Sequence, residues 1–248
     1  MPTAPDKLFL NQTADRRQFL NATLGICAIA SPALSLQLAP GEGSLTKEER
    51  NRMTPSQVID ELTKGNERFR KGKMVPRNYL VEKRTSAAGQ FPAAVVHTCL
   101  DSRVPAEIIF DAGIGDVFVS RVAGNIINDD ILGSMEFGCA VSGAKVVLVL
   151  GHTACGAVKG AISDVVTGNL TGLLARIKPA IPATEFEGEK SVKNDTYVDA
   201  VARTNVRLGL AEIRRRSPIL AELEKKGNIK LTGAMYNLAN GVVEFLDN

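Results

Sequence analysis

The chain has 248 residues, of which 44% are hydrophobic and 23% are charged, fractions close to those of an average soluble globular protein. They exclude a disordered chain, a collagen and a coiled coil, and the length is sufficient for one well-buried α/β domain. Thirty basic residues against 27 acidic ones give a net charge of +3, and tryptophan is absent. Neither the charge nor the aromatic content therefore indicates a nucleic-acid partner.

The first 40 residues have the pattern of an export signal. Arg16 and Arg17 precede an uncharged apolar stretch over residues 22–30, which is too short to span a membrane and is followed by small residues. An arginine pair followed by Phe-Leu resembles a twin-arginine signal, which directs the export of folded proteins. We expect residues 1–40 to be an export signal and linker, and residues 41–248 to form a single domain. The processed protein would then be periplasmic, with no stable membrane insertion.

Two alternatives to cleavable export remain for this segment. It could be an amphipathic or disordered extension that is not recognised by an export system. A lipid anchor on Cys27 is disfavoured, because Ile26 occupies a position where lipoprotein signals have a small residue.

From residue 54 onward, the sequence predicts helices that alternate with strands. Thr54, Pro55 and Gln57 combine an N-cap, a first-turn proline and a capping box at the start of a helix that ends near Gly72. The later elements are expected in this order: strands at 91–99 and 116–122, a helix capped by Asn128, a strand at 144–151, a helix at 155–166 stopped by Gly168, helices at 195–216 and 217–227, and a hairpin of 229–238 with 242–246. This alternation predicts an α/β fold with a mainly parallel central sheet flanked by helices and a C-terminal β-hairpin at the edge.

Three candidate metal ligands stand at the ends of predicted parallel strands. Cys99 ends the first strand, and His152 and Cys155 follow the strand 144–151 with the spacing His-x-x-Cys. The carboxyl ends of parallel strands meet in the crevice where α/β folds bind ligands. Two thiolates and one imidazole suit Zn²⁺ and leave a fourth tetrahedral position. A disulfide between Cys99 and Cys155, or buried residues with no common role, are the alternatives.

The occupant of the fourth position decides whether such a site is structural or catalytic. His97 lies on the same strand face as Cys99, about 7 Å away along the strand. Two side chains at that separation do not easily converge on one ion. We therefore expect His97 to be a packed, hydrogen-bonded histidine. Asp101 could close the site as a ligand, or water could occupy the position and donate a hydrogen bond to Asp101. Arg103 is expected to bind this carboxylate through two parallel hydrogen bonds. With water present, the residues indicate an enzyme whose zinc-bound hydroxide attacks a small electrophilic carbon.

These motifs closely resemble those of the β-class carbonic anhydrases. The resemblance spans roughly residues 54–246 and is carried chiefly by Cys99-Leu100-Asp101-Ser102-Arg103-Val104-Pro105 and His152-Thr153-Ala154-Cys155-Gly156. It implies that Cys99, His152 and Cys155 hold one zinc ion per chain. It also implies that Asp101 and Arg103 form a catalytic dyad. The expected activity is the reversible hydration of CO₂ to bicarbonate and a proton.

The resemblance extends to two substrate-binding positions and to the assembly. Gln90 matches a glutamine that hydrogen-bonds substrate, and Phe118 matches an apolar residue of the CO₂ pocket, although a loop residue and a core residue are the alternatives. The family forms dimers or higher homo-oligomers with active sites near the subunit interface. We therefore expect a homodimer or larger assembly, with the helix at 54–72 and the terminal hairpin as candidate contacts.

Departures from the family pattern keep other functions open. The family's regulatory bicarbonate site includes a tryptophan where this chain has Val96, so that site is not expected here. Leu100 and Thr98 replace smaller or polar residues beside the first ligand and could reshape the pocket wall. A hydrolase of COS or CS₂ on the same scaffold is therefore an alternative. A zinc-stabilised structural or binding protein with an idle site is another.

Overall fold

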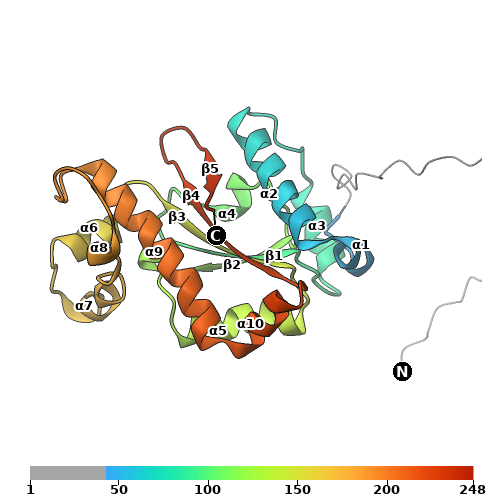
Figure 1. The fold of residues 1–248 in the computed structure, drawn as a ribbon. Helices are drawn as coiled ribbons and strands as arrows, with labels where there is room; N and C mark the ends of the chain where they lie inside the picture. The colour runs from blue at the N-terminus through green and yellow to red at the C-terminus, as the bar shows by residue number, and fades with distance from the viewer. Residues whose placement is uncertain (1–42, 248) are drawn as a thin grey trace, which may run out of the picture. The chain divides into compact units, whose positions relative to one another are not determined.

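The computed structural model describes residues 43–247, and the predicted export signal lies outside this range. A five-stranded sheet with the order β2-β1-β3-β4-β5 runs through the domain (Figure 1). Its strands are β1 (Ala94–Thr98), β2 (Val117–Arg121), β3 (Val146–His152), β4 (Lys230–Tyr236) and β5 (Val243–Phe245). The first four strands are parallel and β5 pairs antiparallel with β4 at the edge, which confirms the predicted fold class.

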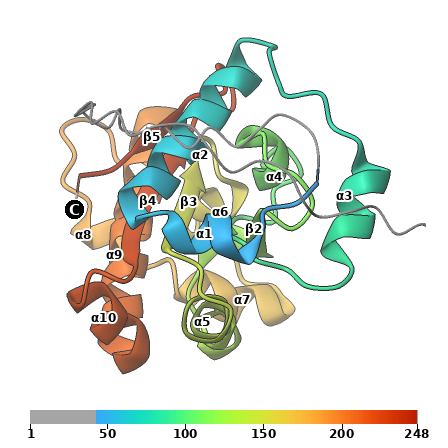
Figure 2. The same cartoon turned by 90° about the vertical axis from the view of Figure 1, so that its right-hand side faces the viewer.

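Helices cover both faces of this sheet, and Figure 2 shows α1 and α2 in front of it. The helices are α1 (Lys47–Arg52), α2 (Pro55–Arg70), α3 (Tyr79–Ser86), α4 (Ala106–Ile109), α5 (Asp129–Glu136), α6 (Gly156–Ile162), α7 (Gly168–Ala175), α8 (Ala180–Ala183), α9 (Asp195–Arg216) and α10 (Pro218–Lys225). A 3₁₀ turn, η1 (Ala123–Asn125), follows β2, and a π-helical turn, η2 (Phe137–Val141), extends α5. Within residues 43–247, no helix has the length and apolarity that crossing a bilayer requires.

Alternate residues of the central strands enter two separate hydrophobic cores. Val147 and Val149 of β3 belong to the core that α5, α9 and α10 cover. Val146 and Leu148 belong to the core on the opposite face, under α2 and α4. All seven residues of β3 are buried, as expected of a parallel strand that is covered on both faces.

Helix starts follow the predicted capping residues. Thr54 accepts a hydrogen bond from Gln57 N–H, and the Gln57 side chain accepts one from Thr54 N–H, so the predicted capping box is confirmed. Asn128 caps α5, and Ser217 caps α10 ahead of a first-turn proline. Each of these signals depends only on neighbouring residues, which explains why the sequence predicts them well.

The helix predicted over residues 155–166 is shorter than expected. It ends at Ile162, because Asp164 adopts a left-handed φ of +53° and Val165 N–H donates to the carbonyl of Gly160. Gly168 does not stop this helix; it is the first residue of α7. Three β-branched residues directly before Gly168, Val165, Val166 and Thr167, lie in the loop between the two helices.

Helix α2 packs closely against α4 at a glycine. A Cβ atom at Gly65 would lie 1.9 Å from the carbonyl oxygen of Phe110, which follows α4. The next residue, Asn66, donates to the carbonyl oxygens of Ile109 (3.2 Å) and Gly241 (2.9 Å). The absence of a side chain at Gly65 therefore lets α2 approach α4 closely. At this distance Asn66 can link the end of α4 to the loop of the C-terminal hairpin.

We expect Gly65→Ala to destabilise the protein by about 2 kcal/mol or more, because the overlap with Phe110 exceeds the gain of about 1 kcal/mol in helix propensity. Denaturant unfolding measures this difference. The matched control is Gly172→Ala in α7, where an added Cβ would meet nothing within 4 Å, and it should be neutral or stabilising. Equal destabilisation of both variants would contradict the close packing of α2 on α4.

Candidate active site

The three predicted metal ligands lie together at the carboxyl ends of two adjacent strands. Cys99 directly follows β1, His152 ends β3, and Cys155 is the N-cap residue of α6. All three are buried, and their ligand atoms lie within 4.8 Å of one another, close enough to share one ion. The parallel pairing of β1 with β3 places Thr98 opposite Leu150 and so brings Cys99 alongside the end of β3.

The imidazole of His152 presents one nitrogen to this cluster. Its Nδ1 lies 2.9 Å from the carbonyl oxygen of Thr153, a contact that requires Nδ1 to carry the proton. Its Nε2 is among the few buried side-chain nitrogens within residues 43–247 that have no hydrogen-bond partner. A histidine that donates through one nitrogen to a backbone carbonyl and leaves the other free has the arrangement of a metal ligand.

The pKa values of the two thiols are shifted in opposite directions. Pairing with the Cys155 thiol lowers the pKa of Cys99, against the effect of burial, and the N–H of Gly124 also donates to its sulfur at 3.3 Å. The same pairing, together with burial, raises the pKa of Cys155. Two buried sulfurs beside an unpartnered imidazole nitrogen favour a bound cation, whose binding displaces the thiol protons. The donor set fits Zn²⁺.

Asp101 and Arg103 form the predicted bidentate pair. Arg103 Nε donates to Asp101 Oδ1 (2.9 Å) and Arg103 Nη2 donates to Oδ2 (2.7 Å), while the backbone N–H of Arg103 adds a bond of 3.0 Å to Oδ1. These hydrogen bonds hold the pKa of Asp101 well below its usual range. Asp101 Oδ2 lies 4.0 Å from His152 Nε2, so the ionised carboxylate faces the ligand cluster.

Three residues that the sequence analysis did not assign contact the loops that carry the ligands. Arg121 donates to the carbonyl oxygen of Cys99 (3.0 Å) and to that of Asp101. Asn205 of α9 donates to the carbonyl of Gly124 (2.9 Å), and Asp199 of α9 accepts from Ala154 N–H (2.7 Å). No local pattern distinguishes Asp199 or Asn205 from other polar residues of that helix. The contacts of Arg121 depend on the pairing of β2 with β1, which no short stretch of sequence specifies.

His97 has the structural role that its sequence position predicts. It is buried, with Nδ1 2.9 Å from Ser120 Oγ and Nε2 3.0 Å from the carbonyl oxygen of Ile126. Burial lowers the pKa of this histidine, which favours its neutral form. Both ring nitrogens are therefore engaged away from the metal cluster.

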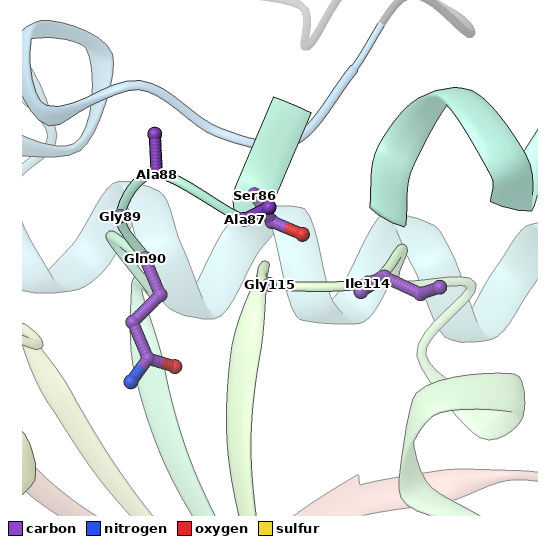
Figure 3. Close-up of a pocket in the computed structure, with 7 residues that line it drawn as sticks. All are labelled: Ser86, Ala87, Ala88, Gly89, Gln90, Ile114 and Gly115. Atoms are coloured by element: carbon purple, nitrogen blue, oxygen red, sulfur yellow. The ribbon is translucent and has the colours of Figure 1, made fainter. Parts of the chain in front are cut away.

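Gln90 lies at the far end of β1 from this cluster, and Phe118 lies on the neighbouring strand β2. Gln90 is exposed and precedes β1, in an open hollow of about 330 Å³ that it forms with residues 86–89, Ile114 and Gly115 (Figure 3). Cys99 follows the other end of β1, and five strand residues span roughly 17 Å. Phe118 lies three residues before the end of β2, with its ring centroid 6.2 Å from that of Phe137.

Known proteins resemble this chain in sequence and in fold. Residues 94–243 match the family model described as Carbonic anhydrase. Carbonic anhydrase 2 of Mycobacterium tuberculosis is 37% identical over 186 residues, which cover 73% of this chain and 87% of that protein. The structure of the β-carbonic anhydrase CafA of Aspergillus fumigatus is similar with a TM-score of 0.58 and 28% identity, covering 66% of this chain and 79% of that one. Structures of two tetrameric β-carbonic anhydrases from Sordaria macrospora share the fold, with a TM-score of 0.59, 22% identity and coverage of 78% and 95%.

Metal analysis of the purified protein should find about one zinc ion per chain. Cys155→Ala removes one of the three donors. We expect its zinc affinity to fall by more than about 100-fold, because replacing a residue that only hydrogen-bonds to a ligand already costs about 10–100-fold. Cys139→Ala is the matched control, because Cys139 is also a buried free cysteine but lies outside the cluster. Burial raises the pKa of the Cys139 thiol to about 12, which makes it a poor ligand. Equal zinc loss in both variants would contradict the site.

Proposed function

Because the chain belongs to the β-class carbonic anhydrases, we propose that its active site is the cluster at the carboxyl ends of β1 and β3. Its activity is the reversible hydration of CO₂ to bicarbonate and a proton, with zinc as cofactor. In this proposal Cys99, His152 and Cys155 hold the metal. The unpartnered Nε2 of His152, aimed at two buried sulfurs, is the single observation that most supports this assignment.

The catalytic roles follow from how the side chains are held. Bound zinc supplies Lewis acidity, which lowers the pKa of water far enough to make it a nucleophile near neutral pH. Asp101 would accept a hydrogen bond from the attacking water and orient it toward the carbon of CO₂. Arg103 keeps the carboxylate ionised and fixes its direction through two side-chain hydrogen bonds. Since its pKa lies well below the usual range, Asp101 serves as an acceptor that orients the water and not as a store for the released proton.

A homo-oligomer accounts for the positions of the two substrate-binding candidates. Gln90 and the metal ligands stand at opposite ends of β1, so Gln90 could contact substrate only if a second copy of the chain supplied it. Phe118 lies on β2, the edge strand of the sheet, whose residues are partly exposed. We therefore propose that the protein forms a homodimer, or a larger assembly of dimers, with β2 and the residues before β1 near the contact.

Replacing Asp101 by Asn should lower the rate of CO₂ hydration by about 100-fold or more, because the neutral amide cannot form the bidentate ion pair with Arg103 and accepts less strongly from water. Stopped-flow hydration assays measure the effect. Asp164→Asn is the matched control, since Asp164 is an exposed aspartate whose partner, Lys178, lies away from the ligands, and it should retain the full rate.

The same preparations distinguish the alternative functions. Sulfide release from COS or CS₂, faster than CO₂ hydration, would assign the scaffold to that hydrolysis instead. Zinc-loaded wild-type protein that hydrates no CO₂ would identify an idle structural site. An Asp101→Asn variant as fast as wild type would contradict the role assigned to the carboxylate.

We also propose that residues 1–40 are an export signal with its linker and that residues 41–248 are the periplasmic domain. Ser44 N–H donates to Thr85 Oγ1 (3.2 Å), and Leu45 N–H donates to Asp116 Oδ1 (3.3 Å). Leu45 is also buried. These contacts support a folded domain that begins by residue 44, and we expect the signal to be cleaved before that point.

Changing Arg16 and Arg17 together to Lys should abolish export through the twin-arginine route while leaving the charge of the segment unchanged. Fractionation of the producing cells, followed by N-terminal sequencing of the exported protein, measures the outcome. The wild-type chain should appear in the periplasm without its first residues, and the double variant should remain inside with them. Retention of both proteins in the cytoplasm would contradict the export proposal.

A further inference from the structure

The turn between the metal ligands His152 and Cys155 has a conformation that an alanine rarely adopts. The turn consists of Thr153 and Ala154, and Ala154 has a φ of +52°, in the left-handed region that favours glycine. Such a conformation persists only where the surrounding contacts impose it. Because two ligands flank the turn directly, its shape determines how His152 and Cys155 approach each other.

The two residues of the turn are held from different elements. Thr153 N–H donates to the carbonyl oxygen of Tyr236 (3.0 Å), and Thr153 Oγ1 accepts from Leu238 N–H (3.0 Å), so β4 and the residues after it hold the first half. Ala154 N–H donates to Asp199 Oδ1 at 2.7 Å. The strained half of the turn is therefore held by a carboxylate of α9, 45 residues further along the chain.

Asp199 is a partly buried carboxylate for which this hydrogen bond is a main polar contact. The carboxylate is partly buried, and burial raises its pKa, while the hydrogen bond from Ala154 acts in the opposite direction. Its titratable neighbours are Asp195, Lys159 and His152, and Lys159 already pairs with Asp195 at 2.8 Å. A partly buried carboxylate needs a good donor, and hydrogen bonds to an ionised acceptor are stronger than neutral ones.

We propose that Asp199 is a positioning residue for the metal site: its carboxylate holds the Ala154 amide in the left-handed turn and so fixes the separation of His152 and Cys155. It contacts neither ligand atom nor substrate in this role. The inference rests on the proposed function in taking His152 and Cys155 as zinc ligands. Residues behind a metal ligand typically affect metal affinity by about 10–100-fold, which sets the size of the expected effect.

The test measures zinc affinity by competition with a chromogenic chelator for wild type, Asp199→Ala and Asp199→Asn. Asp195→Asn is the matched control, because Asp195 lies on the same helix but is exposed and pairs with Lys159. We expect Asp199→Ala to bind zinc about 10–100-fold more weakly. Asp199→Asn should fall between Asp199→Ala and wild type, because its amide oxygen still accepts from Ala154, and Asp195→Asn should match wild type.

A second readout separates positioning from general stability. The visible absorption of the cobalt(II)-loaded protein reports ligand geometry, and it should shift in Asp199→Ala but not in Asp195→Asn. If Asp199 were merely structural, its replacement would lower the thermal midpoint while the zinc dissociation constant and the cobalt spectrum stayed those of wild type, and this result would overturn the proposal.

Two further outcomes are also decisive. If Asp199→Ala does not fold, Asp199→Asn decides, and a zinc affinity equal to that of Asp195→Asn overturns the proposal. A wild-type protein that binds no zinc would instead overturn the proposed ligand set on which the inference rests.

Discussion

The in-register parallel pairing of β1 with β3 is the constraint on which the rest of the site depends. It places Thr98 opposite Leu150, so that the residues leaving both strands emerge side by side at one edge of the sheet. A shift of one residue would turn Cys99 to the other face. The register is maintained because alternate residues of β3 enter two separate cores, and slippage would exchange these faces along the strand.

The electrostatics of the site follow from this placement. Two sulfurs and one imidazole nitrogen are brought together in a buried position, where an unpaired charge is costly and a cation is favoured. The neighbouring carboxylate of Asp101 stays outside the donor set because Arg103 binds both of its oxygens. Helix α9 supplies two supporting hydrogen bonds. Asn205 donates to the loop whose Gly124 N–H contacts Cys99, and Asp199 accepts from the turn after His152. The sheet thus brings the donors together, and the surrounding hydrogen bonds set their directions.

Much of the fold was predictable because its signals are local. The capping residues Thr54, Asn128 and Ser217 each begin a helix where the sequence places one, and the apolar run of β3 is the central strand. The helix after Cys155 was predicted too long, because its end depends on Asp164 adopting a left-handed conformation, which aspartate tolerates but does not require. Short elements such as α1, α4 and α8 were not predicted, since so few residues carry too little periodicity to be recognised.

The sequence by itself determined the chemistry of the donors and the family, because Cys99, the His-x-x-Cys spacing and the Asp101–Arg103 pair are short motifs at the ends of recognisable strands. Only the tertiary structure decided how these motifs meet and what supports them. It placed Gln90 at the far end of β1 from the ligands, and it brought Asp199 against Ala154 from a distant helix. Strand register and contacts between distant residues arise from packing over the whole domain, and packing leaves no signature in any short stretch of residues.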